Sequence, residues 1–143
     1  MVSRVIPVQA FDLVIFGGTG DLAKRKILPS LFRRFVAGQM PNDAFVIGVA
    51  RSELDTKSYQ DLVISALKEF EPELVASAEL EIFIKQIKYV QIDAQGDFGW
   101  SDLADKVRKN AIQAFYFSVS PSLFGQLAEK LHQYSIASQS SRI

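Results

Sequence analysis

Short apolar runs alternate with helical patterns along this chain, and that alternation limits the possible folds more than any other feature. The apolar runs are FDLVIFG, AFVIGVAR, KYVQID and QAFYFSVSP, at 11–17, 44–51, 88–93 and 113–121. Segments with helical spacing lie at about 22–35, 52–70, 72–83 and 98–110. Strands that alternate with helices build a parallel sheet through right-handed crossovers. The pattern therefore predicts an α/β fold of the doubly wound, Rossmann-like class, with helices on both faces of the sheet.

Length and composition are consistent with one domain over residues 1–143. Sixteen Lys and Arg balance sixteen Asp and Glu, so the overall charge favours neither nucleic acid nor a membrane as a partner. The chain has no cysteine and one histidine, which excludes thiolate and multi-histidine metal sites, and we expect no metal. No apolar stretch approaches the ~18 residues of a membrane-spanning helix. We expect a cytoplasmic protein.

A glycine-rich turn, GGTGDLA at Gly17–Ala23, joins the first expected strand to the first expected helix. Gly18, Gly20 and Ala23 fit the pattern G-x-G-x-x-A. In that pattern the first glycine allows the tight turn, the second admits a pyrophosphate to backbone N–H groups, and the small third residue brings the helix close to the strand. The helix N-terminus adds a positive field, so the turn predicts a dinucleotide site. Because a pyrophosphate would repel Asp21, we expect this residue to cap the helix.

The turn has two other interpretations. A phosphate-binding loop of the NTPase kind would use Lys24, but its pattern needs glycine where Ala23 stands and a hydroxyl where Arg25 stands. Both positions fail, which disfavours that interpretation. A glycine-rich connector without a ligand is the second alternative.

An arginine follows the second expected strand, where NAD-binding domains commonly carry an acid that binds the adenosine ribose. Arg51 offers a planar fork of donors to a 2′-phosphate, and Ser52 adds a hydroxyl. These residues predict NADP rather than NAD as the cofactor. The alternative is an ordinary solvated arginine.

Three blocks, FGGTGDLAKRKILPSLF, VIGVARS and FYFSVSPSLF, resemble the N-terminal coenzyme domain of the glucose-6-phosphate dehydrogenase family. The blocks occur in the family's order, and the resemblance covers nearly the whole chain. The resemblance implies an NADP-dependent oxidoreductase that converts glucose 6-phosphate to 6-phosphogluconolactone, the first step of the pentose phosphate pathway. It also implies a homo-oligomer as the whole protein.

The resemblance assigns roles to individual positions. The expected cofactor-binding residues are Gly17, Gly18, Thr19, Gly20, Asp21, Leu22, Ala23, Lys24, Arg51, Ser52, Asp93, Ala94, Ser118 and Pro121. The resemblance also implies that Lys26 reaches toward the phosphate of the sugar substrate.

The family's E-K-P-x-G and R-I-D-H-Y-x-G-K segments, the second of which carries the proton-accepting histidine, do not occur in this chain. We expect the chain to be the coenzyme part alone, without a catalytic base, and we expect His132 at the surface or near a helix end. A short NADP-dependent reductase would need a Tyr-x-x-x-Lys pair, which the chain lacks. A non-catalytic NADP-binding module stays open. We expect Phe115, Tyr116 and Phe117 in a buried strand, and Trp100 in packing.

Overall fold

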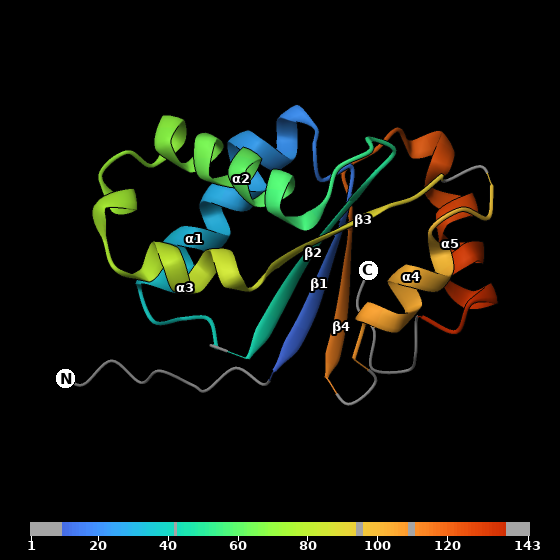
Figure 1. Ribbon diagram of the computed structural model, residues 1–143. Coiled ribbons are helices and arrows are strands. Elements are labelled where there is room, and N and C mark those ends of the chain that lie inside the picture. Colours follow the sequence, from blue (N-terminus) through green and yellow to red (C-terminus); the bar gives the residue numbers. More distant parts are fainter. Residues whose placement is uncertain (1–9, 42, 94–95, 109–110, 137–143) are drawn as a thin grey trace.

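The computed structural model describes residues 10–41, 43–93, 96–108 and 111–136, and Figure 1 shows a central sheet between two layers of helices. The strands are β1 (Phe11–Phe16), β2 (Ala44–Ala50), β3 (Ile87–Gln91) and β4 (Ile112–Phe117). They are parallel, in the order β3-β2-β1-β4. Their carboxyl ends therefore lie together, toward the top of Figure 1. The predicted doubly wound α/β fold is confirmed.

The helices cover the two faces of the sheet in sequence order. One face carries α1 (Leu28–Val36), α2 (Thr56–Phe70) and α3 (Glu79–Lys85), on the left in Figure 1; the other carries α4 (Trp100–Lys106) and α5 (Phe124–Gln133). After β3 the chain crosses to the other side of β1 to form β4. This change of direction between β1 and β4 opens a crevice at the carboxyl ends of the strands.

The core has two parts, because alternate residues of each strand point to opposite faces. In β1, Ile15 packs with α1, α2 and α3, whereas Val14 and Phe16 pack with α4 and α5. All three side chains are at most 2% exposed. Such continuous burial is typical of a central strand in a parallel sheet, and it explains why the run has no polar alternation over these positions.

The first helix begins with a wide turn that the sequence pattern does not indicate. Residues Ala23–Ile27 form a π-helical turn, η1, and the N–H of Leu28 donates to the carbonyl of Ala23, five residues earlier. Pro29 follows at once in α1. Because proline has no N–H to donate and its ring crowds the carbonyl four residues before it, the wider turn relieves the conflict. Leu22, expected at an apolar helical position, is 44% exposed.

Two predicted elements are shorter or divided in the structure. The helix expected at 72–83 is split into a 3-10 turn, η2 (Leu74–Ala76), and α3. Ser77 separates them with an extended backbone, and its hydroxyl donates to the carbonyl of Leu74 at 2.7 Å, as serine often does in competition with helix bonds. The fourth strand ends at Phe117 and not at Pro121, which begins a second 3-10 turn, η3 (Pro121–Leu123).

The aromatic run in β4 is only partly buried. Phe115 is 3% exposed, but Tyr116 is 45% exposed, because β4 is an edge strand and its tyrosine side lacks a covering helix among the described residues. Trp100 is fully buried, as expected. Over the described ranges, no helix has the length and apolar character needed to cross a bilayer.

Candidate functional site

A cleft of about 710 Å³ opens at the carboxyl ends of the strands, in the crevice between β1, β2 and β4. Seven residues expected to bind a cofactor line it: Gly17, Thr19, Gly20, Arg51, Ser52, Asp93 and Ser118. They come from four loops that are distant in the sequence. The structure therefore brings together the glycine turn, the loop after β2 and the ends of β3 and β4.

The conformation that only glycine adopts easily lies at Gly17, and the prediction that Gly18 makes the tight turn is wrong. Gly17 has φ +84°, and a Cβ there would lie 2.1 Å from the carbonyl oxygen of Ser118. Gly18 is required for a different reason. A Cβ at Gly18 would lie 2.8 Å from the hydroxyl of Tyr59 and 2.9 Å from the Cα of Gly48.

Backbone bonds hold the glycine turn against β2. The N–H groups of Gly17 and Gly18 both donate to the carbonyl of Val49, at 2.8 and 3.1 Å, and Gly20 N–H donates to Gly17 at 2.9 Å. Within the described ranges, the N–H groups of Thr19 and Asp21 have no backbone acceptor. Donors without a backbone acceptor at the start of a helix suit an anionic group such as a diphosphate.

Gly20 leaves the outer side of the turn open. A Cβ at Gly20 would meet only the carbonyl oxygen of Gly17 within 4 Å, at 3.2 Å. A ligand can therefore approach the backbone closely at this position. Such an approach is the role of the second glycine in the pattern.

Several other predicted residues lie outside the cleft lining. These are Gly18, Asp21, Leu22, Ala23, Lys24, Lys26 and Pro121. Gly18 and Ala23 are buried behind the turn, while Asp21, Lys26 and Pro121 are exposed. Asp21 does not act as the expected cap, because its carboxylate accepts from Arg25 Nε at 2.8 Å, one turn further on. Ala94 lies outside the described residues.

The loop after β2 is held through its backbone, and its side chains reach solvent. Gln91 Nε2 donates to the carbonyl of Arg51 at 3.1 Å, and the hydroxyl of Tyr89 donates to the carbonyl of Ser52 at 2.6 Å. Arg51 and Ser52 are exposed. In the part of the chain that the structure describes, the Arg51 guanidinium has no ion pair. Its donors are therefore available to an anion at the mouth of the cleft.

Trp100 supports the third loop, a role that sequence analysis missed. Its ring Nε1–H lies 3.1 Å from the carbonyl oxygens of both Asp93 and Gly96. Gly99 has φ +85°, and a Cβ there would lie 1.9 Å from the carbonyl oxygen of Gln91. The adjacent Gly99 and Trp100 after an expected strand were the sequence signal for this role. The carbonyl groups that accept from the Trp100 ring are brought near it only when the chain folds.

The rest of the cleft wall is mostly apolar, and it was not predicted as part of the site. Its apolar residues are Phe16, Val49, Ala50, Ile92, Val119, Leu123 and Leu127, and Ser120 is its polar member. Such a wall can cover a flat ring and exclude water from it. Arg51 and Asp93 are the titratable side chains among the described lining residues, and His132 is an exposed residue of α5 outside that lining. The described residues contain no group of three or more potential metal ligands among His, Cys, Asp and Glu.

An open parallel sheet with a glycine turn between β1 and a helix, and a cleft at the point where the strand order reverses, defines a dinucleotide-binding α/β domain. Comparison with known families narrows this class. The chain belongs to the family described as "Glucose-6-phosphate dehydrogenase, NAD binding domain", whose model matches residues 14–143. The family is thus one of nicotinamide-dinucleotide-binding domains.

Similar proteins agree with this assignment. The chain is 38% identical over 146 residues to glucose-6-phosphate 1-dehydrogenase of Rhizobium meliloti (strain 1021), covering 100% of this chain and 30% of that protein. It is 37% identical to the enzyme of the same name from Gluconobacter oxydans (strain 621H), covering 95% and 29%. The solved structure "Glucose-6-phosphate dehydrogenase in complex with its substrate glucose-6-phosphate" matches with TM-score 0.80 and 25% identity, covering 95% of this chain and 30% of that one. This chain therefore spans about three tenths of their length.

Proposed function

We propose that this chain is the NADP-binding part of a glucose-6-phosphate 1-dehydrogenase, which oxidises glucose 6-phosphate to 6-phosphogluconolactone. The observation that carries the proposal is the cleft that joins the glycine turn after β1 to Arg51 after β2. The names of the relatives, and the sugar phosphate bound in the similar solved complex, support the reaction. An arginine at a position that commonly holds an acid supports NADP over NAD.

The cleft residues divide into three tasks. The N–H groups of Thr19 and Asp21 would donate to the diphosphate of the dinucleotide. Arg51 would bind the 2′-phosphate through its planar fork, with Ser52 beside it. The apolar residues Val119 and Leu123, which follow β4, would cover the nicotinamide ring, which accepts a hydride when the dinucleotide is bound.

Lys26 stays a prediction for the sugar side. Its side chain is exposed on η1, outside the cleft lining. An exposed ammonium group on the first helix is free to bind a phosphate that approaches from outside the dinucleotide cleft.

We predict that the 143-residue chain binds NADP more tightly than NAD, and that Arg51→Ala narrows the ratio of the two affinities about tenfold or more. A charge-assisted hydrogen bond contributes roughly 1.5 to 3 kcal/mol to binding. NAD has no 2′-phosphate, so the substitution should weaken the binding of NADP and not that of NAD. Isothermal titration calorimetry with both dinucleotides measures the ratio. Arg34→Ala, at an exposed arginine on α1, is the matched control and should leave it unchanged. Equal affinities in the unmutated chain would contradict the NADP assignment.

A further inference from the structure

Two tyrosines behind the cleft hold the two loops on which nucleotide binding depends. Tyr59, on α2, is fully buried, and its hydroxyl donates to the carbonyl of Gly18 at 2.9 Å. Tyr89, on β3, is 4% exposed, and its hydroxyl donates to the carbonyl of Ser52 at 2.6 Å. Burial raises the pKa of both hydroxyls, so both stay protonated donors at neutral pH.

The bond from Tyr59 sets the direction of a peptide group at the cleft. The carbonyl of Gly18 and the N–H of Thr19 belong to one planar trans peptide unit, and they point in opposite directions. When Tyr59 holds the carbonyl toward the core, the N–H of Thr19 points away from the core, and Thr19 lines the cleft. The hydroxyl thus acts on a donor that it does not touch.

The two rings pack together where α2 lies against the sheet. Their centroids are 4.9 Å apart. Gly48 of β2 makes the space, because a Cβ there would lie 2.3 Å from Cζ of Tyr59. The same strand continues to Val49, whose carbonyl holds the glycine turn, and Arg51 follows the end of the strand. The rings therefore link the turn that would bind the diphosphate to the loop that would bind the 2′-phosphate.

We propose that Tyr59 and Tyr89 are positioning residues with separate effects on the nucleotide. Tyr59 orients the Gly18–Thr19 peptide toward the diphosphate, which NADP and NAD share. Tyr89 holds the backbone of Ser52, next to Arg51, at the 2′-phosphate, which only NADP carries. This inference rests on the proposed NADP-binding function.

Removal of each hydroxyl, with the ring kept, separates the two roles. We expect Tyr59→Phe to lower the affinities for NADP and NAD by the same factor, about fivefold, and to leave their ratio unchanged. We expect Tyr89→Phe to lower NADP affinity about fivefold and to leave NAD affinity unchanged. A purely structural role would not split the two dinucleotides in this way. Tyr116→Phe, at the exposed tyrosine of β4, is the matched control and should change neither affinity.

Calorimetry with NADP and NAD, together with circular dichroism of each variant, decides among the outcomes. If the unmutated chain binds neither dinucleotide, the proposed function fails and this inference falls with it. If the unmutated chain binds NADP and both folded variants have the same dinucleotide affinities as the unmutated chain, this inference is wrong but the proposed function is not. If Tyr89→Phe lowered the affinities for NADP and NAD by the same factor, the assignment of Tyr89 to the 2′-phosphate would be wrong. Should Tyr59→Phe fail to fold, the result for Tyr89→Phe decides.

Discussion

At the scale of single residues, neighbouring glycines of one turn meet different requirements. Gly17 adopts a positive φ and passes within reach of Ser118, whereas Gly20 has an ordinary φ and faces the cleft. The sequence pattern G-x-G-x-x-A includes Gly20 but not Gly17. In the structure, the fold requires glycine at position 17, whereas Gly20 leaves space next to the backbone in the cleft.

We predict that Gly20→Val removes dinucleotide binding and that the chain stays folded. The branched side chain would occupy the space next to the helix N-terminus that a diphosphate needs, but within the protein its Cβ would meet only the Gly17 carbonyl, at 3.2 Å. We expect NADP affinity to fall at least about a hundredfold, measured by calorimetry, with a loss of unfolding free energy of about 1 kcal/mol.

Gly17→Val is the contrasting variant. Its Cβ would overlap the Ser118 carbonyl at a positive φ, and we expect a loss of about 3 kcal/mol or more in thermal or urea unfolding. Unchanged NADP affinity in folded Gly20→Val would show that the glycine turn is not the diphosphate site.

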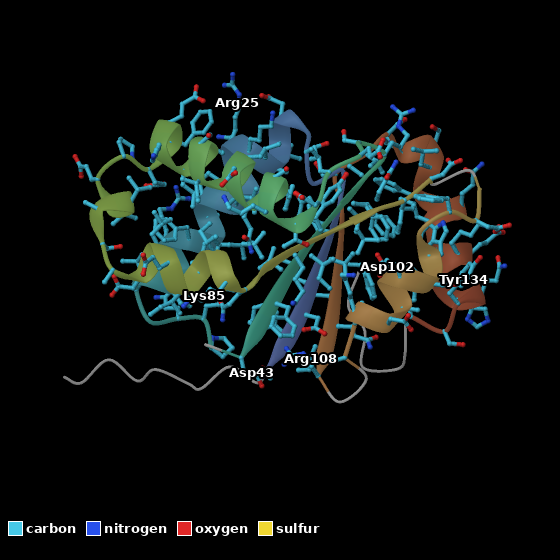
Figure 2. All side chains as sticks on the ribbon, viewed as in Figure 1. Arg25, Asp43, Lys85, Asp102, Arg108 and Tyr134 are labelled. Carbon is cyan, nitrogen blue, oxygen red and sulfur yellow. The ribbon has the colours of Figure 1, made fainter. Side chains whose placement is uncertain are left out.

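At the scale of elements, an ion-pair cluster joins the amino ends of the strands, opposite the cleft. Asp12 of β1 is fully buried, and it accepts from Arg108 Nε and Nη2 at 2.9 and 2.7 Å. Arg108 also pairs with Asp43, just before β2, and its guanidinium lies 4.3 Å from the centre of the Phe45 ring. Figure 2 shows Arg108 and Asp43 side by side below the sheet. The contacts to Asp12 and Asp43 raise the pKa of Arg108.

We predict that Arg108→Ala lowers the free energy of unfolding by about 3 kcal/mol, because it leaves the buried Asp12 carboxylate without its charged partner. Urea unfolding measures this loss. The control variant Arg34→Ala should have a free energy of unfolding close to that of the unmutated chain. Since the cluster lies at the end of the sheet away from the cleft, NADP affinity of the folded variant should not change. A large drop in affinity would mean that the two ends of the sheet are coupled.

At the scale of the whole molecule, the described residues form a cleft that suits a dinucleotide, and the lining of that cleft offers few groups that could accept a proton from a sugar. Proton removal from a hydroxyl requires a base within hydrogen-bond reach. The described cleft lining offers Arg51 and the exposed carboxylate of Asp93, and His132 lies outside it. Positioning of the sugar would also need a second surface opposite the cleft.

We predict that the 143-residue chain with NADP and glucose 6-phosphate gives no NADPH above background, followed by absorbance. A longer product that continues into a substrate-binding domain should turn over under the same conditions. Turnover by the short chain at a similar rate would contradict the expectation that the chain lacks a catalytic base. Lys26 and Tyr116 would then be the first residues to test as proton acceptors. If the longer product bound NADP but did not oxidise the sugar, a non-catalytic module would be the better interpretation.

Local patterns in the sequence were sufficient for the fold class, for the glycine turn and for the arginine after β2. Apolar periodicity and glycine placement act over a few residues, so they are visible before the chain folds. The start of α2 also follows a local rule, because Asp55 caps the helix and accepts from Ser58 N–H at 2.7 Å. The helix break at Ser77 and the π-helical turn before Pro29 were missed, because neither depends on hydrophobic spacing. The break involves the side-chain hydrogen bond of Ser77, and the wide turn accommodates the ring and the missing N–H of Pro29.

Only the tertiary structure decided which side chains support the site. Tyr59 and Gly18 are far apart in the sequence, and nothing around either of them indicates that they meet. The same holds for Tyr89 with Ser52, and for the assignment of the positive φ to Gly17, which depends on Ser118 of a distant strand end. These contacts arise where a helix packs on a sheet or two parallel strands end side by side. Sequence periodicity identifies the elements that pack, but side-chain volumes and hydrogen-bond partners across the layers determine which atoms touch.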